Sequence, residues 1–188
     1  IRILFQCFLH IICCQLRTNH YRRLAAQLTL KKMTLDVGAE EDSWELTDGW
    51  ELSAAPGTGV DSISDPQGLA SSSEGSGLLT GVTGDEPQGT GTVGPWDVVL
   101  SGATGDVTVS EQPQGGYTFD SLDCGDFTVE PDDSAPGGTI SGIVAGDDVI
   151  CTFQNKQIPG EVEWQKVDES DAPKFLAGSE WLLTGPLI

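Results

Sequence analysis

The sequence predicts an all-β protein built as a sandwich of two sheets, and three observations support this prediction. Of its 188 residues, 24 are glycine and 10 are proline, and Thr, Val and Ser are frequent. This composition favours short strands and turns over helices. After residue 35 the chain shows no sustained helical periodicity. Short segments of alternating apolar and polar residues recur instead, separated by turn residues, as is typical of β-sandwiches.

The globular pattern begins at Gln27, with a first strand expected at about 28–34. A second strand is expected at 49–54, where Trp50, Leu52 and Ala54 alternate toward one face. Residues 56–94 are rich in Gly, Ser, Thr, Asp and Pro, so they form either a long surface loop or a set of weak edge strands. Further strands are expected at 95–100, 107–111, 117–119, 127–129, 137–143 and 147–155.

Three of these strands have an apolar face that ends in a polar side chain. Leu28 and Leu30 lead to Lys32, Val107 and Val109 lead to Glu111, and Val149, Cys151 and Phe153 lead to Asn155. A buried carboxamide costs free energy unless something engages it. A lysine, a glutamate and an asparagine are together the groups needed to form an intramolecular Lys–Asn amide bond.

An alternative for the lysine is a solvated position at the edge of a sheet, where it would oppose strand-to-strand aggregation. Lys31 competes with Lys32, but it falls on the opposite face from Leu28 and Leu30. Residues 33–154 contain no Lys or Arg. A lysine at the end of the first strand therefore suggests a specific role for Lys32. The formal net charge of −20 argues against nucleic-acid binding.

Residues 1–25 do not share this pattern and are expected to be a non-globular or non-native segment. Their apolar stretch at 3–14 is too short to cross a bilayer as a helix, and it resembles the remnant of a signal peptide. Cys7, His10, Cys13 and Cys14 do not have the spacing of a structural zinc site. No metal or cofactor is therefore expected.

Residues 158–188 are expected to be a linker and the truncated start of a second, similar module. Val162, Trp164 and Lys166 repeat the face formed by Leu28, Leu30 and Lys32. The segment 178–186 in turn echoes residues 49–54. Tandem modules of one kind are the simplest interpretation.

Several of these segments, taken together and in order, resemble the SpaA/CnaB-type, prealbumin-like (Ig-like) domains of Gram-positive, especially actinobacterial, surface proteins and pilins. The matching segments are 28–32, 111–117, 151–155, 164–168 and 177–186. The resemblance covers roughly residue 26 to the end and predicts a CnaB-type β-sandwich at 26–157. It implies an isopeptide bond between first-strand Lys32 and last-strand Asn155, promoted by Glu111. It also implies that Lys166 is the corresponding lysine of the second module.

The expected chemistry depends on burial. A lysine in an apolar interior more readily becomes a neutral amine nucleophile. A buried carboxylic acid favours its protonated form, so it can activate the asparagine carbonyl and shuttle the proton as ammonia leaves. The reaction happens once and has no external substrate, so it is autocatalytic maturation rather than enzyme activity. From residue 26 onward there is no histidine, no Gly-x-Ser-x-Gly motif and no phosphate loop.

Cys124 and Cys151 are the two cysteines within residues 26–157. Together with the extracellular-looking composition they suggest a disulfide and an oxidising compartment. The alternative is two separate buried thiols.

These features predict a structural stalk module of a bacterial cell-surface protein, located outside the cell. The expected partners are neighbouring modules of the same chain, and a membrane or wall anchor is not visible in the sequence. The alternative is an adhesive module that binds a host or matrix ligand, or calcium, through the acidic loops at 61–86 or 120–133. Acidic loops are usually only solvated.

Overall fold

The computed structural model describes residues 25–73, 76–84, 89–160 and 178. The chain divides into two compact units, residues 1–158 and 159–188. All twelve strands of the described residues lie in the first unit, between Ala25 and Gln157, and this part of the chain contains no helix. No helix that could span a membrane occurs among the described residues. Of the expected non-globular segment 1–25, residues 1–24 lie outside the described residues, whereas Ala25 begins the first strand. Lys166 of the second module also lies outside the described residues.

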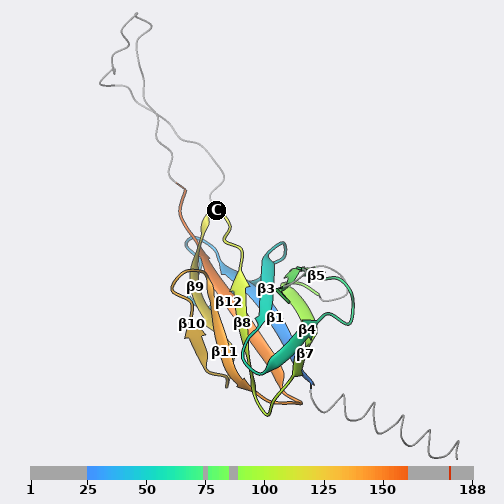
Figure 1. The fold of residues 1–188 in the computed structure, drawn as a ribbon. Coiled ribbons are helices and arrows are strands. Elements are labelled where there is room, and N and C mark those ends of the chain that lie inside the picture. The colour runs from blue at the N-terminus through green and yellow to red at the C-terminus, as the bar shows by residue number, and fades with distance from the viewer. Residues whose placement is uncertain (1–24, 74–75, 85–88, 161–177, 179–188) are drawn as a thin grey trace, which may run out of the picture. The chain divides into compact units, whose positions relative to one another are not determined.

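The first unit is a sandwich of two sheets, which Figure 1 shows stacked face to face. The first sheet has the order β4-β7-β1-β12-β9, with β2 paired to β1. Its strands are β1 (Ala25–Leu35), β2 (Glu45–Leu46), β4 (Val60–Ser64), β7 (Thr92–Leu100), β9 (Tyr117–Asp123) and β12 (Asp148–Gln157).

The second sheet has the order β10-β11-β8-β3-β6-β5. Its strands are β3 (Glu51–Pro56), β5 (Ser71–Ser72), β6 (Leu79–Val82), β8 (Gly105–Glu111), β10 (Val129–Pro131) and β11 (Gly137–Ile143). The sequence-based prediction of an all-β sandwich is therefore confirmed.

The first and last strands of the unit are neighbours in the centre of the first sheet. β1 and β12 pair in parallel, with Gln27 opposite Asp148 and Leu35 opposite Lys156. Parallel pairing places the start of β1 and the end of β12 at opposite ends of the same pair of strands. A pull on the two ends of the unit would therefore shear β1 along β12.

The predicted alternation is present in the strands that carry the candidate site. Ala26, Leu28 and Leu30 of β1 are fully buried, and β8 and β12 bury every second residue in the same way. These side chains meet those of the opposite sheet in one core between the sheets. Burial of this apolar surface is the main force that holds the two layers together.

The structure distinguishes between the two alternatives for residues 56–94, because it places the short strands β4, β5 and β6 there. β4 is the outermost strand of the first sheet, and β5 is the outermost strand of the second. Ile63 and Leu79 are the apolar residues by which β4 and β6 reach the core. The segment is thus a set of short strands at sheet edges rather than one long loop.

One predicted strand is shifted along the chain and another is longer than predicted. The strand expected at 127–129 lies at Val129–Pro131, while Phe127 precedes it and packs partly buried against the core. The strand expected at 117–119 continues to Asp123, because it pairs along β12 as far as Thr152. Its burial alternates only as far as Ser121, and a register shift between Gln154 and Asn155 interrupts its pairing with β12.

Candidate functional site

The polar ends of three strands meet inside the sandwich. Lys32 comes from β1 and Asn155 from β12, in the first sheet, while Glu111 comes from β8 in the opposite sheet. All three belong to the buried polar residues: Lys32 is 0% exposed, Asn155 2% and Glu111 5%. The structure thus brings together the three side chains that the alternation had singled out.

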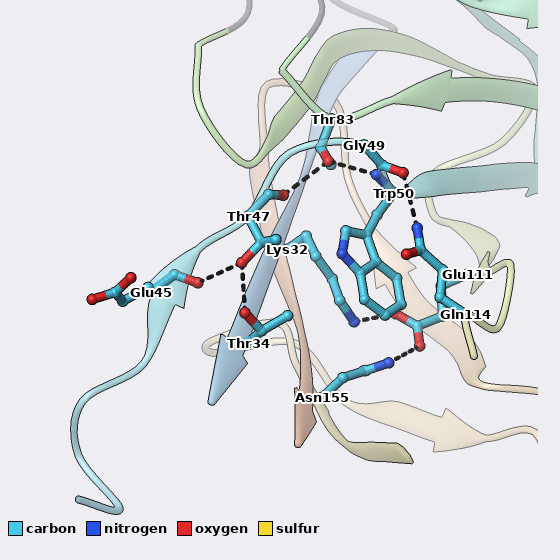
Figure 2. A network of polar contacts seen from close by, with 10 residues as sticks. All are labelled: Lys32, Thr34, Glu45, Thr47, Gly49, Trp50, Thr83, Glu111, Gln114 and Asn155. Atoms are coloured by element: carbon cyan, nitrogen blue, oxygen red, sulfur yellow. Dashed lines mark hydrogen bonds and ion pairs between the residues drawn. The ribbon is translucent and has the colours of Figure 1, made fainter. Parts of the chain in front are cut away.

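The Glu111 carboxylate bridges the other two side chains (Figure 2). Lys32 Nζ donates a hydrogen bond to Glu111 Oε2 at 2.5 Å, which is also a buried ion pair. Asn155 Nδ2 donates to Glu111 Oε1 at 2.6 Å. One carboxylate therefore touches both the amine and the amide nitrogen, through different oxygens. Charge-assisted hydrogen bonds are shorter and stronger than neutral ones.

The strand register explains how Lys32 and Asn155 approach each other. In the β1–β12 ladder Lys32 lies opposite Phe153, and Asn155 lies opposite Thr34. Lys32 and Asn155 are thus diagonal neighbours two positions apart, with both side chains on the core face. Long side chains reach across such diagonals.

Burial changes the acidity of the lysine. It lowers the pKa of Lys32 from 10.5 to about 8, although the hydrogen bond and the negative charge of Glu111 act in the opposite direction. Desolvation disfavours the ammonium form and so favours the neutral amine. Lys32 is consequently much closer to its nucleophilic form at neutral pH than an exposed lysine would be.

Asn155 Oδ1 has no hydrogen-bond partner, although it is buried. An unsatisfied buried carbonyl costs about 1–3 kcal/mol. Rotation of the carboxamide by a half-turn would bring Oδ1 to Glu111 Oε1, where it would find a donor if that carboxyl carried a proton. The site therefore accommodates the charged pair as it stands, and also a neutral pair with the amide turned.

Trp50 is a part of the site that the sequence did not reveal. Lys32 Nζ lies over the indole, 3.9 Å from the ring centroid, and the side chain of Trp50 is 1% exposed. Alternation with Leu52 and Ala54 predicts that Trp50 is buried, and this is confirmed. Nothing in the local sequence indicates which side chain it would meet.

Cys124 and Cys151 form a disulfide with an S–S distance of 2.04 Å. It ties β12 to the residue that follows β9, and its two cysteines are 27 positions apart in the sequence. Cys151 lies on the core face of β12, four residues before Asn155. Both sulfurs are buried in the core.

Some carboxylates of the acidic loops accept hydrogen bonds from their own turns. Asp65 accepts hydrogen bonds from the backbone N–H groups of Gln67, Leu69 and Ala70 at 2.6–2.8 Å. Although desolvation alone would raise it, these bonds hold the pKa of Asp65 below its usual value. Asp132 caps Ser134 in the same manner.

No cluster of three or more potential metal-ligating side chains occurs within residues 25–73, 76–84 and 89–160. The loop residues Glu74, Asp85 and Glu86 lie outside these ranges. Asp65 and Asp132 thus act as local turn caps.

Comparison with known proteins does not assign the chain to a family. No family model and no curated protein matches the chain. Three solved structures of a pilus-presented adhesin, Spy0125 (Cpa), are similar to it at 12%, 10% and 13% sequence identity, with TM-scores of 0.37, 0.39 and 0.35. They cover 72%, 71% and 73% of this chain, which in turn spans 28% of the adhesin chain.

Proposed function

We propose that the unit at 26–157 is a structural stalk module of a bacterial cell-surface protein, locked by an autocatalytic isopeptide bond between Lys32 and Asn155. The observation that carries the proposal is the single carboxylate that contacts both Lys32 Nζ and Asn155 Nδ2 in the buried core. The sequence resemblance to SpaA/CnaB-type domains supports the same conclusion. So does the Cys124–Cys151 disulfide, which fits an extracellular location.

The reaction begins with a proton transfer within the pair. Lys32 passes a proton from Nζ to Glu111 Oε2 along their 2.5 Å hydrogen bond, which leaves a neutral amine and a neutral acid. The amine then attacks Cγ of Asn155. Because the fold holds the amine and the amide side by side, the entropy of bringing them together has already been spent in folding.

The collapse of the tetrahedral intermediate needs a proton at the leaving nitrogen. Nζ gives up a second proton and Nδ2 gains one, and Glu111, in contact with both nitrogens, relays it. The Cγ–Nδ2 bond breaks, ammonia leaves, and the new Cγ–Nζ amide keeps one N–H. Glu111 retains the first proton and can donate it to the amide carbonyl, which satisfies the oxygen that lacks a partner in the starting state.

We expect the rate of bond formation to fall as the pH rises through about 8, the pKa of Lys32. The active pair shares one proton, which can lie on Lys32 or on Glu111. Below this pKa the pair keeps that proton, whereas above it the proton is lost and no acid remains for the leaving group. Unreacted chain diluted from denaturant into buffers of increasing pH, and sampled by intact mass, measures the rate.

A mechanism that needs only the free amine predicts the opposite trend. Its rate would rise through the same pH and then level off. That result would exclude the relay through Glu111 while leaving the bond itself intact.

The proposed bond would change how the module carries tension. Force would enter along β1 as far as Lys32, cross the bond, and leave through the last residues of β12. Everything between the two linked positions would lie outside the force path, including both cysteines of the disulfide. β1 and β12 would be prevented from sliding along each other, although their parallel pairing puts them in shear.

Single-molecule stretching of the chain from its two ends tests this function. We expect the parent to show no unfolding extension from residues 33–154, with or without reductant. The Lys32→Met variant should lengthen by about 35 nm when it unfolds, and by about 9 nm more after reduction of the disulfide, at 3.3–3.6 Å per released residue. A parent that lengthens like the variant would contradict the proposal that the bond carries the applied force.

A further inference from the structure

We infer that Trp50 is a positioning residue for Lys32, and that its indole face holds the amine beside Glu111 and stabilises its charged form before the bond forms. This inference rests on the proposed function, because it concerns the nucleophile of the proposed reaction. It assigns a role to a side chain on which the proton relay itself does not depend.

The contact has the geometry of a cation–π interaction. Lys32 Nζ lies 3.9 Å from the centroid of the Trp50 ring, well inside the distance of about 6 Å at which such contacts are significant. Figure 2 shows the lysine side chain running alongside the indole, with Nζ turned toward Glu111. Both side chains are almost completely buried, so water screens their attraction little.

Trp50 is itself fixed in place from two sides. Its backbone N–H donates to Thr83 Oγ1 at 3.0 Å, and its carbonyl accepts from the Thr83 backbone N–H at 2.9 Å. The Thr83 hydroxyl in turn donates to the Thr47 carbonyl at 2.9 Å. The indole ring meets Tyr117 edge-on, with centroids 5.3 Å apart and planes at 79°. These hydrogen bonds fix the backbone of Trp50, and its ring cannot turn away from Lys32 without losing the contact with Tyr117.

The turn that leads into Trp50 is held as well. Gly49 has a φ of +80°, a left-handed conformation that glycine adopts without strain. Its carbonyl accepts a hydrogen bond from Gln114 Nε2 at 2.9 Å. Gln114 follows Glu111 by three residues. The segment after β8 therefore links the strand that carries Glu111 to the turn that carries Trp50.

Two opposing influences thus act on the lysine besides its carboxylate partner. Desolvation favours the neutral amine, whereas the face of the indole favours the cation. Among the described residues, Glu111 is the one charged group in contact with Lys32 Nζ. The other titratable groups on β1, β2, β3, β8, β9 and β12 are partly buried or exposed. They are Lys31, Glu45, Glu51, Asp106, Tyr117, Asp123, Asp148, and Lys156 in its ion pair with Asp120.

The experiment separates this electrostatic role from simple space filling. The full chain is prepared as the Asn155→Ala variant, which cannot form the bond, with either natural or multiply fluorinated tryptophan. Fluorination withdraws electrons from the ring face and weakens its attraction for a cation, yet it changes the shape of the ring little. The titration of Lys32 is followed by NMR of its ¹³Cε, with Lys31 and Lys156 as reference signals.

We expect fluorination to lower the titration midpoint of Lys32 by about 0.4–1.5 pH units, the shift that corresponds to the usual strength of such contacts. The Trp50→Phe chain is the matched control, because it keeps Trp96 and the other tryptophans but lacks the indole under Lys32. Its midpoint should not respond to fluorinated tryptophan. A midpoint that is equally insensitive in the chain with Trp50 would overturn the inference.

This outcome is independent of whether the isopeptide bond forms. The titration uses a variant without Asn155, so it reports on Trp50 and Lys32 alone. Absence of the bond in the parent would therefore contradict the proposed function, and an unmoved midpoint would contradict only the role of Trp50.

Discussion

Replacement of Glu111 by glutamine is expected to slow formation of the Lys32–Asn155 bond by about 10²–10⁴-fold, the usual contribution of a positioned acid–base group. Glutamine has nearly the same shape as glutamate, but it can neither accept the proton of Lys32 nor return one to the leaving nitrogen. Both of these contacts are made by Glu111 in the structure, at 2.5 and 2.6 Å. The fraction of chain that has lost one ammonia, measured by intact mass over time after refolding, gives the rate.

Glu51→Gln is the matched control for this prediction. Glu51 lies on β3, the neighbour of β8, but its side chain is exposed. Its substitution removes the same charge without touching the site, so the rate should stay at the parental value. A Glu111→Gln chain that folds and cross-links as fast as the Glu51→Gln chain would show that the carboxylate has no part in the chemistry.

The second large effect is on stability. A cross-link between Lys32 and Asn155 closes almost the whole unit into one loop, which restricts the unfolded chain and stabilises the fold by about 5 kcal/mol in the chain-entropy model. Lys32→Met keeps a long apolar stem in the core but cannot form the bond. We expect its thermal midpoint to lie roughly 15–20 °C below that of the parent, given the usual size of such shifts.

Lys31→Met is the control for the loss of a lysine from β1. Lys31 is the adjacent residue on β1, and it lies on the outer face of the sheet. Its substitution makes the same chemical change but leaves Lys32 in place, so calorimetry should find a midpoint close to the parental one. Equal losses in the two variants would mean that Lys32 contributes no more than a surface lysine.

The sequence predicted the three side chains of the candidate site because their strands have a simple alternation. β1, β8 and β12 bury every second residue, so Lys32, Glu111 and Asn155 follow from the period-two pattern alone. The final strand adds a second clue, because an asparagine ends its apolar face. Such a residue needs a partner, and the structure supplies Glu111 from the opposite sheet.

Other features depend on tertiary contacts that no local pattern encodes. The parallel pairing of β1 with β12 joins segments from opposite ends of the unit. Their register makes Lys32 and Asn155 diagonal neighbours, and neither strand's own sequence specifies it. The contact between Trp50 and Lys32 likewise depends on the position of the residues before β3, where the backbone N–H of Thr47 donates to the Lys32 carbonyl. The short strands β4 and β5 are rich in serine and lie at sheet edges, so their sequences resemble loops.

The most direct test of the central claim is the intact mass of the reduced parent chain beside the Lys32→Met and Asn155→Ala variants. The account predicts a deficit of about 17 Da in the parent, the loss of one ammonia on amide formation, and the full expected mass in both variants. Proteolytic mapping should then recover the peptide that contains Lys32 joined to the peptide that contains Asn155. A folded parent with its full mass would contradict the account, and would leave Lys32, Glu111 and Asn155 as a non-covalent polar cluster.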